Sequence, residues 1–291
     1  MTLNFYLQNV LIAFDGDQSA AEHIRQFVGI DPAAQNLIAV HMDSNNEQAG
    51  SIIAMAEDYR SDFIVMALHE AEPVGDHGTI RCPVTVCEEV ALTAGIPVMM
   101  LRSEMIGGIK SMAAISRILV PIDGSTVSQE IVPIAAMLSM QFEAPVHLIT
   151  VIDPLTALPA AYAYLPTSNL DRQDALVSLQ REANRALDTV EKSLRLAGVE
   201  VSAELVLGPT VRCLLAAIGS SDIVAMTTHG KGNASRSKLG SVALHLLRNS
   251  PVPVIVLLPS ASCAVNGRGR ASWDIRTPAY GTAAPARSAV R

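Results

Sequence analysis

The sequence has few aromatic residues and little charge. Aromatic side chains make up 4% of the 291 residues, with a single Trp, and charged residues make up 17%. The hydrophobic 49% therefore consists mainly of aliphatic residues and Met. Strands of branched aliphatic residues beneath aliphatic helices are typical of α/β proteins. This composition favours an α/β fold with a sizeable buried core.

Long hydrophobic runs and zinc-like cysteine pairs are also lacking. No apolar run approaches the roughly 18 residues of a membrane span, so we expect no membrane partner. The first ten residues contain no Lys or Arg, unlike a signal peptide. The spacing of the four cysteines, Cys82, Cys87, Cys213 and Cys263, is not that of a zinc site. We interpret them as ordinary thiols and expect a cytoplasmic location.

Positive charge is scarce in the first part of the chain. Residues 1–108 hold 4 Lys and Arg against 15 Asp and Glu, and residues 109–258 hold 12 of each. Residues 259–291 hold 5 against 1. An acidic first part would repel the phosphates of nucleic acid, so no nucleic-acid partner is expected. The neutral second part is better suited to an anionic ligand.

Two halves of the chain resemble each other. Each opens on an apolar run that ends in Asp-Gly, at Asn9–Gly16 and at Arg117–Gly124. Strand-like runs then alternate with helix-like segments, which predicts right-handed βαβ units and a parallel sheet. We therefore predict α/β domains at residues 1–107 and 111–259, joined by a linker near 106–111. Residues 260–291 lack periodicity and are predicted to be a disordered tail.

The second half is longer because it has an insert. Apolar residues recur at helical spacing up to Leu196, with Asp171 as the predicted N-cap and Gly198 as the residue that ends the helix. The other predicted strands are 37–43, 61–67 and 96–101 in the first half, and 146–153, 199–207, 221–226 and 252–257 in the second.

A glycine-containing segment follows one of these strands and precedes a predicted helix at 242–248. Gly230 and Gly232 allow positive φ and a close approach of the backbone to phosphate oxygens. Gly240 and Ser241 open the helix, whose unpaired N–H groups and positive dipole end attract anions. The Ser241 hydroxyl either donates to phosphate or caps the helix. Positive charge comes from three side chains: Lys231, Arg236 and Lys238.

The location of this segment supports the same interpretation. Ligands of open parallel sheets bind beyond the carboxyl ends of the strands. Asp123, at the end of the opening strand of the second half, is expected at the same edge. Its carboxylate either accepts hydrogen bonds from ribose hydroxyls or the adenine amino group, or it is a turn former and helix cap. The segment therefore predicts a phosphate-binding site.

The chain resembles a tandem universal stress protein over both halves. Nucleotide-binding members of that family carry Gly-x2-Gly-x9-Gly-Ser/Thr at this location. Gly230, Gly240 and Ser241 match this motif, and Thr227 stands where the family has its first glycine. The resemblance implies two Rossmann-like (adenine nucleotide alpha hydrolase-like) domains, each with a mostly five-stranded parallel sheet. It also implies that a β-branched Thr227 makes the loop less permissive.

The resemblance also implies a set of ligand-binding positions. Pro121 and Asp123 fall on the motif that lines the adenosine pocket, and Val151 falls where a backbone group contacts adenine. Met226 falls on the pocket wall, and Val242 follows the serine that contacts phosphate. The implied ligand is ATP, with AMP or ADP as alternatives. Mg²⁺ is compatible with such a site, although no carboxylate cluster in the sequence demands it.

The first half has lost this motif. When Pro97 is aligned with Pro253, Val84 and Thr85 stand at the positions of Gly240 and Ser241, and Val74 stands at the position of Gly230. The surrounding loop is acidic. We expect a degenerate copy that packs against the second half, with one nucleotide per chain. The resemblance implies pairing through the last strands, within the chain or in a homodimer.

The sequence leaves three hypotheses about function open. The leading hypothesis is a non-catalytic, ATP-binding protein with a regulatory or stress-response role. A second is slow ATP hydrolysis or autophosphorylation, although His229 has no Ser-His-Asp set around it and is interpreted as a polar loop anchor. A third is an interaction protein whose nucleotide site is vestigial.

Overall fold

The first half of the chain contributes four strands to the fold. The computed structural model describes residues 9–14, 24, 36–41, 48–68, 84–102, 115–158, 169–220, 222–230 and 239–259. The predicted linker and tail lie outside them. The first-half strands are β1 (Asn9–Phe14), β2 (Asn36–His41), β3 (Phe63–Leu68) and β4 (Val98–Arg102), and the helices are α2 (Gln48–Asp58) and α3 (Val84–Thr93). These strands pair in parallel in the order β2-β1-β3-β4.

The second half contributes five strands in the order β9-β8-β5-β6-β7, again parallel. The strands are β5 (Arg117–Pro121), β6 (Val146–Ile152), β7 (Val201–Leu207), β8 (Asp222–Thr227) and β9 (Val254–Leu257). The helices are α5 (Thr126–Gln129), α6 (Val132–Phe142), α7 (Pro154–Ala157), α9 (Asn169–Leu196), α10 (Thr210–Ala217) and α11 (Ser241–Asn249). Continuous burial along β8 is typical of a parallel strand covered on both faces.

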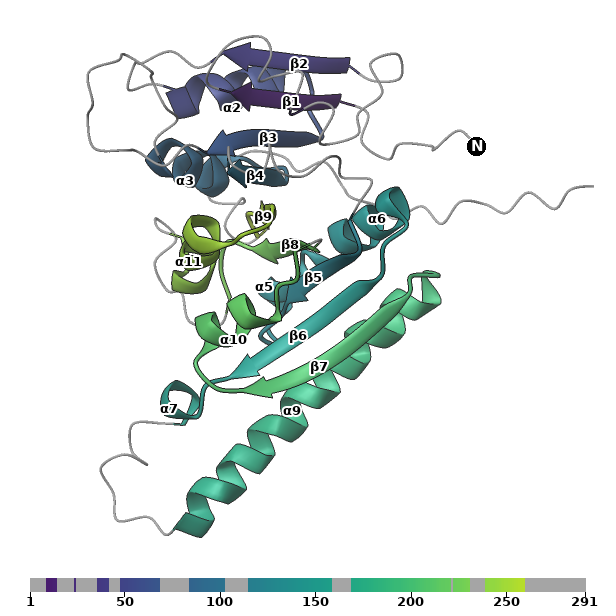
Figure 1. Cartoon of the computed structure of the whole chain (residues 1–291), viewed down its shortest axis with the longest axis vertical. Helices are drawn as coiled ribbons and strands as arrows, with labels where there is room; N and C mark the ends of the chain where they lie inside the picture. Colours follow the sequence, from purple (N-terminus) through teal and green to yellow (C-terminus); the bar gives the residue numbers. More distant parts are fainter. Residues whose placement is uncertain are drawn as a thin grey trace, which may run out of the picture.

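The two halves form one nine-stranded sheet (Figure 1). They meet where β4 pairs with β9, and this is the single antiparallel pair among the described strands. Met99 lies opposite Ile255 in this register, and both are buried. Helices α3 and α11 are also linked, because Arg248 donates to Glu88 at 2.6 Å. The α/β architecture predicted from the sequence is thus present, with both halves in a shared sheet.

Four strands are described in the first half, one fewer than the family resemblance implies. Between β2 and β3, residues 42–62 hold α2. Between β6 and β8, residues 153–221 hold α9, β7 and α10. The shorter connection has no room for a further strand with its helix, because a crossover of that kind takes a dozen residues or more. The prediction of a five-stranded sheet therefore holds for the second half, while four strands are described in the first.

The two ends of α9 differ in how well the sequence predicted them. The helix begins at Asn169, so Asp171 lies in its first turn and the N-cap prediction was wrong. An acidic residue there still interacts favourably with the helix dipole. The C-terminal prediction is confirmed: Gly198 has a φ of 81°, and its N–H donates to Arg195 O at 3.0 Å. A left-handed glycine of this kind is a common helix terminator.

Helices cover both faces of the sheet. Apolar side chains from α6 and α9 pack on one face, and those from α2, α3, α10 and α11 pack on the other. Alternate residues of one strand serve opposite faces, as Ile118 and Leu119 do. The described cysteines, Cys87 and Cys213, are free thiols, in agreement with the sequence. No helix in the described ranges is long and apolar enough to cross a membrane.

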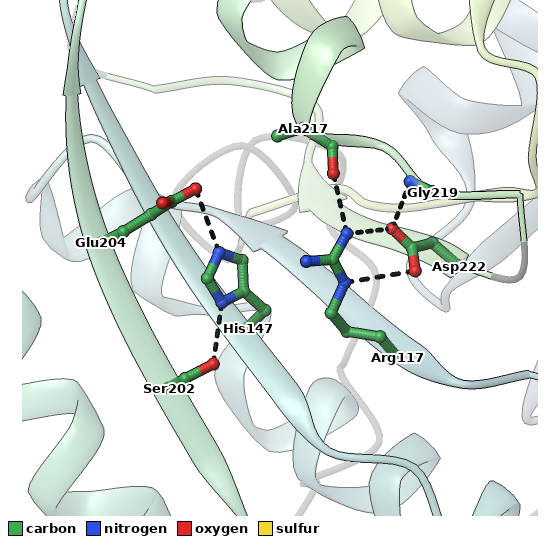
Figure 2. A network of polar contacts seen from close by, with 7 residues as sticks. All are labelled: Arg117, His147, Ser202, Glu204, Ala217, Gly219 and Asp222. Carbon is green, nitrogen blue, oxygen red and sulfur yellow. Dashed lines mark hydrogen bonds and ion pairs between the residues drawn. The ribbon is translucent and has the colours of Figure 1, made fainter.

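Polar side chains fix the amino ends of four neighbouring strands (Figure 2). On β5, Arg117 donates to Asp222 of β8, from Nε at 3.2 Å and from Nη2 at 2.5 Å. These bonds raise the pKa of the guanidinium, against the opposing effect of burial. On β6, the His147 ring lies 2.8 Å from Ser202 Oγ and 3.1 Å from Glu204 Oε1. His147 is therefore a satisfied structural histidine.

Candidate functional site

The predicted ligand-binding positions of three strands lie at one edge of the sheet. β5 pairs with β6 on one side and with β8 on the other, all in parallel. Their carboxyl ends therefore carry Pro121, Val151 and Met226 side by side. Met226 is buried in the core on the α11 side, and Val151 and Val242 pack against the same cluster. The structure thus brings these predicted residues together.

Asp123 forms a hydrogen-bonded turn directly after β5. Its Oδ1 accepts from Ser125 N at 2.9 Å and from Ser125 Oγ at 2.6 Å. Gly124 between them has a φ of 78°, which favours glycine. Ser125, rather than Asp123, caps α5 by accepting from Ser128 N at 3.0 Å. Asp123 therefore forms the turn that the sequence indicated, but Ser125 and not Asp123 caps the helix.

Gly230 packs against the other side of the same carboxylate. A Cβ atom added at Gly230 would lie 3.2 Å from Asp123 Cγ and would overlap Oδ2. The φ of Gly230 is outside the left-handed region, so the freedom of glycine to adopt positive φ is not used at this position. Glycine suits this position because the Asp123 side chain lies so close that an added Cβ atom would force it to move. The contact joins two residues that the sequence placed in the site separately.

Gly240 closes the base of the loop that follows β8. Its N–H donates to Thr228 O at 2.9 Å, and a Cβ atom at Gly240 would lie 3.1 Å from that oxygen. Its φ of −58° is one that any residue adopts, so the close approach again explains the glycine. Thr228 N in turn donates to Leu257 O of β9 at 2.9 Å. The loop therefore leaves the sheet and returns to it at Thr228.

Thr227, at the position of the missing glycine, is the last residue of β8. A β-branched residue fits a strand well, and no strain is recorded there. Its buried hydroxyl donates to His229 O at 2.6 Å. The His229 ring is also buried, and its Nδ1 lies 2.8 Å from Thr228 Oγ1. This agrees with a polar anchoring role for His229.

The amino end of α11 points at this loop. The N-cap is Gly240, without a side-chain hydrogen bond, and the first turn closes when Leu244 N donates to Gly240 O at 2.9 Å. Ser241 is the first helical residue and is exposed, so its hydroxyl is not the cap. The first N–H groups of a helix have no partner within the helix. They are donors available to an anion.

Other predicted residues of the loop lie outside the described residues. These are Gly232, Lys231, Arg236 and Lys238. Within the described ranges, no group of three or more His, Cys, Asp or Glu could hold a metal ion.

The equivalent loop of the first half also lies outside the described residues, but the strands on either side of it fix its alignment. Ile64 lies opposite Val98 in β3 and β4, as Val224 lies opposite Val254 in β8 and β9. Counted forward from β3, the position of Gly230 is Glu70; counted back from β4, it is Val74. Neither is glycine. Helix α3 begins at Val84, at the position of Gly240.

Sequence reasoning missed Ser125, Ser128 and Thr228, and it gave no role to the hydroxyl of Thr227. Ser125 and Ser128 shape the Asp123 turn, and Thr227 and Thr228 hold the start of the loop. A Ser-x-x-Ser pattern directly after Asp-Gly is a signal for the first pair, because Ser is a common N-cap residue. No local signal indicates the second pair, whose role depends on β9 and Gly240.

Comparisons with known proteins agree with this geometry. The model of the universal stress protein family matches residues 114–257. A universal stress protein of Methanocaldococcus jannaschii is 32% identical over 145 residues, which cover 48% of this chain and 81% of that protein. One from Mycolicibacterium smegmatis is 28% identical over 166 residues, covering 55% of this chain and 51% of the relative.

Solved structures resemble the chain over most of its length. A protein of unknown function from Pseudomonas aeruginosa has a TM-score of 0.58 and 15% identity, covering 89% of this chain and 95% of that one. A universal stress protein from Archaeoglobus fulgidus has a TM-score of 0.54 and 18% identity, covering 88% and 98%. At these identities the likeness concerns the fold.

Proposed function

Because the chain belongs to the universal stress protein family, we propose that it is an ATP-binding protein with a regulatory or stress-response role, whose second half binds the nucleotide. One observation carries the proposal: at both described glycines of the loop, an added Cβ atom would crowd a neighbouring group. Gly230 is against the Asp123 carboxylate, and Gly240 is against the Thr228 carbonyl. Glycines that allow such close backbone approach at the carboxyl edge of a parallel sheet suit a phosphate site.

The triphosphate would bind between this loop and α11. The backbone of Gly230 is accessible to a ligand, and the first N–H groups of α11 are oriented as donors. The Ser241 hydroxyl is exposed and makes no cap, so it can donate to a phosphate oxygen. ADP and AMP would use the same groups with fewer phosphate contacts. Mg²⁺ would be held by the phosphates themselves, since the described residues supply no metal cluster.

The adenosine moiety would bind over the ends of β5 and β6. Asp123 has one oxygen engaged by Ser125, and its other oxygen faces Gly230. This carboxylate is placed to accept a hydrogen bond from a ribose hydroxyl. Pro121 and Val151 lie beside it on neighbouring strands, with Met226 as the wall below.

The first half would serve as the partner of the second. Glu70 and Val74, the two residues that align with Gly230, both carry side chains that crowd or repel phosphate. The halves associate through β4 and β9, the same kind of contact that two copies of a single domain would make. A single nucleotide per chain follows from this asymmetry.

Helix α11 gives the nucleotide a route to the first half. The helix begins at Ser241 beside the loop and ends near Arg248, which binds Glu88 of α3. Hydrogen bonds from the first N–H groups of α11 to the phosphates would fix the start of the helix and thereby its far end. The proposed protein acts in the cytoplasm by binding nucleotide and passing the change between its two halves. This role requires no catalytic residues, so we assign none.

Isothermal titration of the full chain with ATP, ADP, AMP and adenosine tests the proposal. We expect a stoichiometry close to one and tighter binding of ATP than of adenosine. Ser241→Ala should weaken ATP binding, whereas Thr85→Ala, at the equivalent helix start in the first half, should not. Absence of ATP binding up to roughly millimolar concentration contradicts the proposal. ATP turnover above that of Asp123→Ala would favour a slow ATPase instead.

A further inference from the structure

The residue that departs from the family motif makes a specific contact at the site. Thr227 is 3% exposed and its hydroxyl donates to His229 O at 2.6 Å. The bond spans the point where the chain leaves β8 and enters the loop. A glycine at this position would have no group to make it. The substitution therefore adds an interaction to the loop.

The acceptor of this bond belongs to the peptide that joins His229 to Gly230. In a trans peptide the C=O and N–H groups point in opposite directions. By holding the His229 carbonyl, the Thr227 hydroxyl also fixes the direction of the Gly230 N–H, on the side away from Thr227. The orientation of one backbone donor is thus set by one side chain.

The hold of Thr227 on this peptide matters because residue 230 is a glycine. A flip of the 229–230 peptide would carry Gly230 toward positive φ, which glycine adopts at no steric cost. The structure has Gly230 outside the left-handed region, in the orientation that Thr227 selects. Without the hydroxyl, this hold on the peptide is lost, and only one of the two orientations presents the N–H to a given ligand.

We propose that Thr227 is a positioning residue for phosphate: its hydroxyl holds the His229–Gly230 peptide in the orientation that directs the Gly230 N–H to the phosphates of the bound nucleotide. The inference rests on the proposed function. Its ligand chemistry is a nucleoside polyphosphate, because the group that Thr227 orients is a backbone donor rather than an adenosine contact. Thr227 acts through the loop backbone.

Three variants of the full chain test this role, with ATP and adenosine as probes. Thr227→Val keeps the shape of the side chain and removes the hydroxyl, and Thr227→Ser restores it. Ser139→Ala is the matched control, because it removes another buried hydroxyl that donates to a carbonyl, Ala144 O at 2.7 Å, in α6. Circular dichroism and the thermal midpoint establish that each variant is folded. Thr227→Ala is the second hydroxyl-free variant if the Val variant does not fold.

We expect a loss of binding affinity that depends on the phosphates of the ligand. Thr227→Val should weaken ATP binding about three- to tenfold, the range for one hydrogen bond, and leave adenosine binding within about twofold. Thr227→Ser should bind ATP like the wild type, and Ser139→Ala should lose stability but not affinity.

Other results overturn the proposal in distinguishable ways. If wild-type protein binds ATP and Thr227→Val binds it equally well, the positioning role is wrong and the proposed function stands. An equal loss of ATP and adenosine affinity, or a Thr227→Ser variant that stays weak, shows a merely structural role. If the wild type binds no ATP, both the function and the positioning role are wrong.

Discussion

The carboxylate of Asp123 lies against the backbone of Gly230. These residues are far apart in the sequence and come from the ends of neighbouring strands, β5 and β8. The contact is close enough to exclude a Cβ atom at Gly230. One oxygen of the carboxylate is held by the Ser125 turn, so the side chain cannot simply rotate away without losing those bonds. This pair fixes the separation of the two strand ends across the candidate site.

The Gly230→Ala variant is expected to damage both the fold and the site. The new methyl group must displace Asp123 or the start of the loop, and overpacking of this kind costs about 1–3 kcal/mol. We expect ATP affinity to fall at least about tenfold, since the displaced groups are those proposed to bind the ligand. Denaturant unfolding and isothermal titration measure the two effects.

Two controls separate the contact from a general effect of losing a glycine. Gly50→Ala, on α2 with no atom within 4 Å of the new Cβ, should stabilise the protein by about 0.5–1 kcal/mol. In an Asp123→Ala background, Gly230→Ala should cost much less, because the obstructing carboxylate is gone. Additive costs in this double-mutant cycle would contradict the assigned contact.

Gly240→Ala is expected to have a smaller effect on the other end of the loop. Its Cβ would lie 3.1 Å from Thr228 O, a backbone atom that β9 holds in place. We expect a loss of about 1 kcal/mol, because the loop base must open slightly, together with weaker ATP binding. Gly198→Ala is the comparison, since strain at its φ of 81° costs about 1–2 kcal/mol far from the site. If both variants leave ATP affinity unchanged, the loop base has no part in binding.

The sequence predicted the strands well because parallel strands are buried on both faces. The run 221–226, for example, corresponds to β8 at Asp222–Thr227, and 146–153 corresponds to β6. Their apolar residues are continuous, so no alternation has to be recognised. The glycines of the loop were also identified, since their spacing and their place between a strand and a helix are local properties.

What the sequence could not predict depends on contacts between distant segments. The reason for Gly230 is the Asp123 carboxylate, and the role of Thr227 is set by a carbonyl two residues later in a turn whose shape the sequence does not reveal. The start of α9 was misplaced at Asp171 because an acidic residue suits both the N-cap and the first turn. Local patterns leave such choices open, and tertiary contacts decide them.

The ion pair of Arg117 and Asp222 is expected to stabilise the second half. The Asp222 side chain is 3% exposed and accepts from Arg117 and from Gly219 N at 2.7 Å, so Asp222→Ala leaves these part-buried donors without their acceptor. We expect a loss of about 2–4 kcal/mol in the free energy of unfolding, near the values for broken buried pairs. ATP affinity should be unchanged, because the pair is at the amino ends of the strands, opposite the site.

An exposed ion pair of the same half provides the control. Arg195 donates to Glu191 at 2.6 Å along α9, and the Arg195 side chain is 62% exposed. Glu191→Ala should therefore cost only about 0.3–0.5 kcal/mol. If Asp222→Ala and Glu191→Ala lower the free energy of unfolding equally, burial of the pair at β5 and β8 contributes nothing to stability. Urea unfolding of both variants at one pH decides between these outcomes.

The Arg117 pair is also expected to be insensitive to alkaline pH. The hydrogen bonds to Asp222 raise the pKa of Arg117 above its ordinary value. A group whose pKa is raised on folding stabilises the protein fully below its unfolded-state pKa, and loses that contribution only as the pH rises through the folded value. The stability difference between wild type and Asp222→Ala should therefore stay constant from neutral pH to about pH 11.

Arg117→Lys tests the sign of this argument. Lysine has an unfolded-state pKa of about 10.4, so the stabilising effect of a Lys–Asp222 pair should begin to decline above about pH 10.4. The variant should also be less stable at neutral pH, because one ammonium group cannot reproduce the two hydrogen bonds that Arg117 makes to the carboxylate. Urea unfolding of wild type and variant at several pH values measures the difference, in which the titration of other groups cancels. If the stability difference between wild type and Arg117→Lys becomes smaller as the pH rises, the assigned pair is contradicted.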